Sequence, residues 1–221
     1  MNKGFIFDLD GVIVDTAKYH YIAWKKLADE MAIDFTEEHN EQLKGVSRLR
    51  SLDILLGIGG VKKSESEKQL LAKRKNDWYL TLIEQLTSKD ILPGAESFIK
   101  EASQKSIKIA LGSASKNALF ILNKLGIDSL FDARIDGTHV SKAKPDPEVF
   151  LKAAESLGLP NENCLVFEDA QAGIEAAQNA NMKCIGIGNN QVLKGAQLVV
   201  SGLDQITVSQ AMEVLNSNIL K

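Results

Sequence analysis

Short apolar runs alternate with longer amphipathic stretches along most of the chain, and this pattern is typical of strands followed by helices. The first apolar run covers residues 4–9. Four helical patterns follow it with no strand-like run between them, at residues 17–31, 37–43, 47–56 and 64–86. This break in the alternation predicts a helical insertion directly after the first strand.

The regular alternation of strand and helix starts after Pro93-Gly94, a dipeptide typical of turns. A helix comes first, and then strands are predicted at residues 107–111, 133–135, 164–167, 183–187 and 197–200, with helices at 116–125, at 147–157 and after the strand at 164–167. Strands joined by helices of this length pair in parallel through right-handed crossovers. We therefore predict an α/β fold: a doubly wound, Rossmann-like, mostly parallel sheet from residues 1–14 and 91–221, with an inserted α-helical cap domain at residues 15–90.

Polar side chains with catalytic potential follow the predicted strands, at the end of the sheet where open α/β folds bind ligands. They are Asp8 and Asp10 after the first strand, Ser113 and Ser115 after the second, Glu168 and Asp169 after the fourth, and Lys144 ahead of the helix at 147–157. Four carboxylates at one mouth repel each other unless a cation offsets their charge. Oxygen ligands of this kind favour Mg²⁺, which commonly bridges to phosphate.

An anionic phosphate group would also need hydrogen-bond donors in this place. Lys144, the Ser113 hydroxyl and the backbone amides at the start of the helix after Ser115 can supply them. The pattern therefore predicts a phosphoryl-transfer site that contains Mg²⁺.

Asp8 and Asp10 point to the same side of an extended chain, but a turn that starts at Gly11 can give them different environments. A carboxylate held against the metal stays ionised and can attack phosphorus, while its neighbour can carry a proton. We assign the first role to Asp8 and the second to Asp10. The competing interpretation is structural, since aspartate and serine often cap helices and close turns; it applies to the Asp8–Asp10 pair, to Glu168-Asp169 and to both serines.

The same residues resemble the four motifs of the haloacid dehalogenase superfamily, in the order in which that superfamily has them. The matching segments are F-D-L-D-G-V-I-V-D-T, the turn at Ser113, Lys144-Pro145 and Glu168-Asp169. The resemblance implies that Asp8 becomes a phosphoaspartate and that Asp10 is the general acid and base. It also implies that Asp8, the backbone carbonyl of Asp10, Glu168 and Asp169 hold magnesium, while Ser113 and Lys144 hold the transferring phosphoryl group.

Within that superfamily, four further segments are similar to the β-phosphoglucomutases. They are D-T-A-K-Y-H-Y-I-A-W, L-K-G-V-S-R, K-R-K-N-D and S-A-S-K-N. This resemblance implies interconversion of β-D-glucose 1-phosphate and D-glucose 6-phosphate through β-glucose 1,6-bisphosphate. The substrate-binding residues that we infer are Thr16, His20, Lys44, Gly45, Val46, Ser47, Arg48, Lys75, Ser115, Lys116 and Asn117. One departure from the pattern is Leu49-Arg50, where acidic residues are expected.

A bisphosphorylated sugar needs a second phosphate site, and the predicted cap offers one. Residues 45–48 form a loop that leads into a helix, where free amides and the Arg48 guanidinium can both bind phosphate. This loop favours a mutase over the alternatives, a sugar-phosphate phosphatase of the same superfamily and a non-catalytic sugar-phosphate sensor. On composition alone, Lys75 belongs to a solvated helix face, His20 is a helix-surface or satisfied core histidine, and Trp24 belongs to the packing of the cap.

Composition and charge limit which partners and which cellular location we expect for this protein. A net charge of -3 gives no general attraction to nucleic acid. The chain has no apolar run long enough for a membrane span, and aspartates occupy the place of a signal peptide's apolar region, so we expect a cytoplasmic protein without a membrane partner. Cys164 and Cys184 lie in apolar runs and are expected to be buried free thiols. A core with its own cap can enclose a cleft, so we expect a monomer.

Overall fold

The centre of the fold is a six-stranded sheet in the order β3-β2-β1-β4-β5-β6. Its strands are β1 (Gly4–Phe7), β2 (Lys108–Gly112), β3 (Ala133–Ile135), β4 (Cys164–Glu168), β5 (Lys183–Ile187) and β6 (Leu198–Val200). Every neighbouring pair is parallel. The structure, a computed structural model, describes residues 2–217. The strand order reverses beside β1, so the residues that follow β1 lie at the point where such sheets bind ligands.

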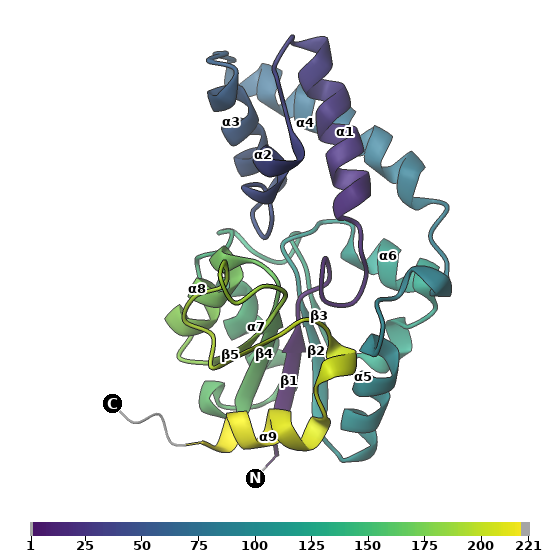
Figure 1. Ribbon diagram of the computed structural model, residues 1–221, viewed down its shortest axis with the longest axis vertical. Coiled ribbons are helices and arrows are strands. Elements are labelled where there is room, and N and C mark those ends of the chain that lie inside the picture. Colours follow the sequence, from purple (N-terminus) through teal and green to yellow (C-terminus); the bar gives the residue numbers. More distant parts are fainter. Residues whose placement is uncertain (1, 218–221) are drawn as a thin grey trace.

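Helices cover both faces of this sheet (Figure 1). They are α5 (Ala95–Gln104), α6 (Ala118–Leu125), α7 (Glu148–Leu157), α8 (Gln171–Asn179) and α9 (Val208–Asn216). Side chains of β1 alternate between the faces: Phe5 and Phe7 pack with α5, α6 and α9, whereas Ile6 packs with α7 and α8. The predicted doubly wound core is therefore confirmed, and its sheet is parallel throughout the described strands.

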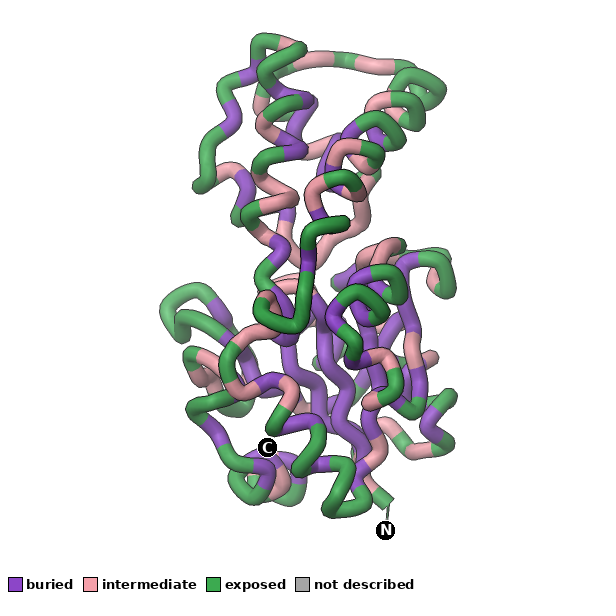
Figure 2. Tube along the Cα trace, turned by 90° about the vertical axis from the view of Figure 1, so that its right-hand side faces the viewer, coloured by how far each residue is buried: buried purple, intermediate pink, exposed green. Residues whose placement is uncertain are grey.

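Four helices between β1 and β2 form a separate lobe over the carboxyl ends of the strands (Figure 1). They are α1 (Ala17–Glu30), α2 (Glu37–Glu41), α3 (Arg48–Ile58) and α4 (Glu65–Ile83). This cap has its own buried core around Trp24, Leu27, Phe35 and Leu52, whereas Tyr79 and Ile83 of α4 belong to the buried cluster of the α/β core; Figure 2 shows buried positions in both lobes. Val14 pairs with Ile91 where the chain leaves and re-enters the core. The division at residues 14/15 and 90/91 stays a prediction, and these paired segments are the hinge that it implies.

Most predicted elements are present, with shifts at their ends. The first strand ends at Phe7, two residues before its predicted end, because the chain turns around Gly11, whose φ is +80°. The predicted helix at 64–86 spans only Glu65–Ile83, and the one at 116–125 starts at Ala118 because Ser115 and Asn117 form a turn ahead of it. Helix α9 was not predicted, and short 3-10 helices occur at Ser88–Asp90, Asp128–Leu130, Asn161–Asn163 and Leu203–Gln205.

The structure also bears on two expectations from composition, the state of the cysteines and the membrane-spanning potential of the helices. Cys164 and Cys184 are free thiols buried in the sheet, as predicted. Across residues 2–217, none of the helices is both long and apolar enough to cross a membrane.

Candidate active site

The innermost part of the site is a buried ion-pair network under the ends of β1 and β4. Lys144 donates hydrogen bonds to Asp8 Oδ1 at 2.6 Å and to Glu168 Oε2 at 2.7 Å. Asp8 and Glu168 extend neighbouring parallel strands, which brings the two carboxylates together around the lysine. Burial opposes the charge on Lys144, but the two carboxylates outweigh it and raise the lysine pKa above its usual value. Lys144 therefore stays protonated and can hold an anionic group beside Asp8.

Asp8, Glu168 and Asp169 offer oxygen atoms that all lie within 4.8 Å of one another. Burial, with the charges of Glu168 and Asp8, raises the pKa of Asp169 well above its usual value, and similar causes raise the pKa of Glu168 to about 7. A bound cation would relieve this repulsion, and a set of carboxylate oxygens suits a hard divalent ion.

Asp169 does not cap the helix that follows it. Helix α8 has Ala170 as its N-cap residue, without a capping side-chain hydrogen bond, so the structural interpretation of Asp169 is wrong. Among the hydrogen bonds within residues 2–217, none engages the Asp169 carboxylate. Gly11 gives this carboxylate its room, because a Cβ atom at position 11 would lie only 2.1 Å from Asp169 Oδ2.

Asp10 has surroundings different from those of Asp8, as the sequence predicted. Its Oδ1 accepts a hydrogen bond from the Thr16 hydroxyl, and its backbone N–H donates to Asp8 Oδ2 at 3.0 Å. Burial, and then the charge of Asp8, raise the pKa of Asp10 to about 7, whereas the bond from Thr16 acts in the opposite direction. A carboxyl group with such a pKa can both accept and release a proton near neutrality.

Lys75 and His20 form a buried pair on the cap. Lys75 Nζ lies 2.8 Å from His20 Nδ1 and sits over the rings of Trp24 and Tyr79, 4.6 Å from each ring centroid. Because Lys75 is only 1% exposed, the solvated-face interpretation is wrong for this residue. Burial, followed by the charge of Lys75, holds the pKa of His20 well below its usual value. Burial, and then the charge of Arg48, also lower the pKa of Lys75, and a neutral imidazole can accept a hydrogen bond from the lysine through Nδ1.

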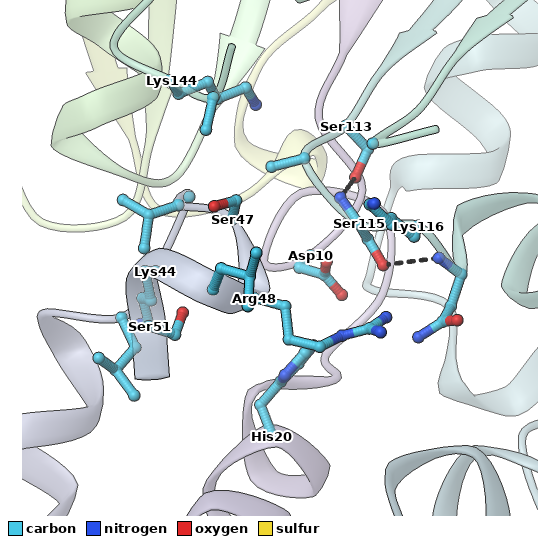
Figure 3. A pocket seen from close by; sticks show the side chains of 18 of the residues that line it. Asp10, His20, Lys44, Ser47, Arg48, Ser51, Ser113, Ser115, Lys116 and Lys144 are labelled. Carbon is cyan, nitrogen blue, oxygen red and sulfur yellow. Dashed lines mark hydrogen bonds between the residues drawn. The ribbon is translucent and has the colours of Figure 1, made fainter. Parts of the chain in front are cut away.

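The loop after β2 is ordered by its own serine side chains. The backbone N–H of Ser115 donates to Ser113 Oγ at 3.1 Å, and that of Asn117 donates to Ser115 Oγ at 3.2 Å (Figure 3). The N-cap residue of α6 is Asn117, without a capping side-chain hydrogen bond, so neither serine caps that helix. Asn117 Nδ2 instead donates to Asn76 Oδ1 on cap helix α4, at 2.9 Å.

The cap loop at residues 44–48 comes down onto the core. Gly45 adopts a φ of +70°, and a Cβ atom there would lie 2.7 Å from Ala170 Cβ. Ser47 caps α3 by accepting a hydrogen bond from the Arg50 N–H. Burial lowers the pKa of Arg48 from its very high usual value, but the guanidinium remains charged at any physiological pH.

One cavity of about 400 Å³ between cap and core collects nearly all of the predicted site residues. Figure 3 shows Arg48 and His20 of the cap and Asp10 and Ser115 of the core around this space. The predicted residues in its wall are Asp8, Asp10, His20, Lys44, Gly45, Val46, Ser47, Arg48, Lys75, Ser113, Ser115, Lys116, Asn117, Lys144 and Asp169. Thr16 and Glu168 lie behind the wall, fully buried, and contact Asp10 and Lys144 from there.

Sequence reasoning missed part of this wall. Trp24 belongs both to the cap core, as predicted, and to the cavity. Asn76, next to Lys75 in the K-R-K-N-D segment, was available from that segment but was not singled out. Lys73 belongs to the same segment, but nothing in the local pattern marks the remaining polar lining residues, which are Asn40, Ser51, Gln69, Ser141 and Lys142.

Two known proteins are similar to this chain over nearly its whole length. A β-phosphoglucomutase of Bacillus subtilis (strain 168) is 45% identical over 208 residues, which are 93% of this chain and 92% of that protein. The crystal structure of a β-phosphoglucomutase from Clostridium difficile superimposes with a TM-score of 0.94 at 48% identity and covers 98% of both chains. The predicted resemblance is thereby confirmed.

More distant similarity extends to hydrolases. A phosphorylated carbohydrates phosphatase of Thermotoga maritima is 29% identical over 217 residues, which are 97% of each protein. The family described as haloacid dehalogenase-like hydrolase matches residues 5–187, a range that contains every residue of the site described above. The chain belongs to the haloacid dehalogenase-like hydrolase family.

Proposed function

We propose that this protein is a phosphomutase that interconverts β-D-glucose 1-phosphate and D-glucose 6-phosphate through a phosphoaspartate and β-glucose 1,6-bisphosphate. The observation that carries the proposal is that one cavity contains two sets of phosphate-binding groups. Asp8, Ser113 and Lys144 form the first set, and Lys44, Arg48, Ser115, Lys116 and Asn117 supply the second. Hydrolysis of a monophosphate requires only the first set, whereas a bisphosphate requires both.

In the half-reaction that consumes β-glucose 1,6-bisphosphate, a carboxylate oxygen of Asp8 forms a bond to phosphorus and the bond from that phosphorus to the sugar oxygen breaks, which leaves the sugar monophosphate. Lys144 and Ser113 hold the phosphoryl oxygens, since the lysine already lies against Asp8. Asp10 donates the proton that the leaving sugar oxygen takes up. In the half-reaction that forms the bisphosphate, a hydroxyl oxygen of the sugar monophosphate bonds to phosphorus, the bond from phosphorus to Asp8 breaks, and Asp10 accepts the hydroxyl proton, for which a pKa of about 7 is suitable.

We infer that Asp8, Glu168, Asp169 and the backbone carbonyl of Asp10 hold Mg²⁺. The three clustered carboxylates and their raised pKa values support this ligand set. When bound, the ion would offset negative charge on the phosphoryl oxygens. Thr16 orients Asp10, and the Lys75–His20 pair, Gly45, Val46 and Ser47 complete the sugar-facing wall.

A coupled assay tests the proposal. β-Glucose 1-phosphate with a trace of β-glucose 1,6-bisphosphate and Mg²⁺ should yield glucose 6-phosphate, measured through glucose-6-phosphate dehydrogenase. Release of inorganic phosphate at a comparable rate would instead support a sugar-phosphate phosphatase, which the similarity to the Thermotoga maritima protein makes the second candidate. Binding without either product would support a sensor, whereas the presence of Asp8, Asp10 and Lys144 in one cavity wall favours an enzyme. A single chain encloses the cavity, which supports a monomeric enzyme.

A further inference from the structure

Cap and core are joined by few polar contacts. Over the described residues 2–217, only two hydrogen bonds between side chains link residues 15–90 to the rest of the chain. One is Thr16 to Asp10, within the hinge region itself. The other is Asn117 Nδ2 to Asn76 Oδ1 at 2.9 Å, between residues 41 positions apart in the sequence. Away from the hinge, this amide pair is therefore the side-chain hydrogen bond that ties the cap to the core.

The two residues of the pair connect the two halves of the site. Asn76 follows Lys75 on α4, so the residue that contacts the core is adjacent to the one that pairs with His20. Asn117 is anchored to Ser115 through its backbone N–H, and Ser115 to Ser113 in the same way. A continuous series of hydrogen bonds thus runs from the cap to the residues beside Asp8. Both amides are also part of the cavity wall.

A second close approach of cap to core lies at Gly45, whose position leaves no room for a side chain against Ala170. The cavity wall includes Gly45 as well as Asn76 and Asn117, so the space that contains Asp8 is bounded by both contacts. The contact at Gly45 is a close van der Waals approach, whereas the amide pair is a directional hydrogen bond. Loss of the amide pair would leave the cap held by the hinge and by apolar contact alone.

We propose that Asn76 is a positioning residue that latches the cap and thereby decides whether the phosphoryl group on Asp8 goes to a sugar or to water. The inference rests on the proposed mutase function. In transfer, a sugar hydroxyl oxygen bonds to phosphorus, the bond from phosphorus to Asp8 breaks, and the hydroxyl proton goes to Asp10. In the competing hydrolysis, a water oxygen bonds to phosphorus, the bond from phosphorus to Asp8 breaks, the water proton goes to Asp10, and inorganic phosphate leaves.

The partition between these products tests the latch. Asn76→Ala should raise the ratio of inorganic phosphate to glucose 6-phosphate by about 5- to 10-fold, the factor that corresponds to one hydrogen bond that holds the cap closed. A merely structural defect would lower both products together and leave their ratio unchanged. Thr81→Ala is the matched control, because Thr81 is an exposed residue of α4 whose hydroxyl contacts only the backbone of its own helix. Its ratio should equal that of the wild type.

A double-mutant cycle identifies the partner. If the bond to Asn117 is the cause, the ratio for Asn76→Ala/Asn117→Ala should equal that for Asn117→Ala alone. An unchanged ratio in Asn76→Ala, in a protein with wild-type melting temperature, overturns the latch while the mutase function stands. A higher KM for the sugar phosphate without a change in ratio also overturns it, since Asn76 would then act as a substrate ligand. A wild-type protein that releases mainly phosphate overturns both the latch and the proposed function.

Discussion

Thr16 donates its hydroxyl hydrogen to the carboxylate of Asp10 from the first residue before helix α1, where the chain enters the cap. The orientation of the proposed general acid and base is therefore coupled to the hinge. This bond favours the ionised form of Asp10 and opposes the burial that raises its pKa. Thr16→Val keeps the shape of the side chain and removes the donor. We predict that the pKa of Asp10 then rises above its value of about 7.

The higher pKa of Asp10 in Thr16→Val should shift the pH profile of the enzyme in one direction. Attack by a sugar hydroxyl needs an ionised Asp10, so the acid limb of the pH profile of kcat/KM should move to higher pH in Thr16→Val, by about one pH unit. The loss of rate should be greatest below neutral pH and small at alkaline pH. A shift to lower pH, or a uniform loss across the profile, would contradict the role given to Thr16. Thr81→Val on the surface of α4 serves as the control and should leave the profile unchanged.

Asp8 is the proposed nucleophile, and its replacement gives the most severe expected loss. Asp8→Ala should lower turnover by at least about 1,000-fold, because no other group can form the covalent intermediate. Labelling with a bisphosphate that carries ³²P should place phosphate on the wild-type protein and none on the variant. Phosphate incorporation or substantial turnover in Asp8→Ala would rule out the whole scheme.

Burial, and after it the charge of Lys75, hold down the pKa of His20. Lys75→Met keeps the length and apolar stem of the side chain, removes the ammonium group and leaves the rings of Trp24 and Tyr79 packed against a side chain. We predict that the pKa of His20 then rises toward its ordinary value near 6.5. Titration of the His20 imidazole by NMR measures this directly. An unchanged pKa of His20 would mean that burial and the charge of Arg48 set it without Lys75.

The core fold and the strand-end site were predictable because both follow from local pattern. Parallel βαβ units place the residues after successive strands at one edge, so Asp8, Ser113 and Glu168 had to approach each other once the strands were located. Lys75 was different: its local sequence K-R-K is that of an exposed helix face, and only the packing of α4 on α1 buries it. The same holds for Asn76, whose contact with Asn117 depends on how the cap is placed over the core.

Gly45 marks the second point where cap and core touch. Gly45→Ala puts a methyl group 2.7 Å from Ala170 Cβ and also strains a backbone with a φ of +70°, so the cap cannot settle fully. We predict a fall in kcat/KM of about 10-fold, with little loss of folding stability because the cap can tilt away. Steady-state kinetics and thermal melting measure the two effects.

A glycine in the same domain provides the control for Gly45. Gly57 lies inside α3, and a Cβ atom there would meet nothing within 4 Å. Gly57→Ala should leave kcat/KM unchanged and raise stability by up to about 0.5–1 kcal/mol, the gain expected when alanine replaces glycine within a helix. Equal kinetic effects of the two variants would show that contact between Gly45 and Ala170 is irrelevant to catalysis.

The effect of Asp169 on folding stability is expected to be opposite without and with magnesium. Without metal, burial and the neighbouring carboxylates raise its pKa, so its charge destabilises the fold progressively as pH rises from its ordinary pKa through the raised value. Asp169→Asn should therefore be more stable than the wild type in EDTA at pH 8. With magnesium the order should reverse, because the wild type gains binding free energy that the variant lacks.

The size of the magnesium effect follows from linkage. At a magnesium concentration about 100 times Kd, the wild type should gain about 2.7 kcal/mol, or roughly 5–10 °C in Tm. Asp169→Asn should gain far less, while Glu213→Gln, an exposed substitution on α9, should behave as the wild type does. Thermal melts of the three proteins in EDTA and in magnesium make the comparison. Equal metal-dependent shifts in the wild type and Asp169→Asn would exclude Asp169 as a ligand, because a cation that gains nothing from this carboxylate cannot be the one that offsets its charge.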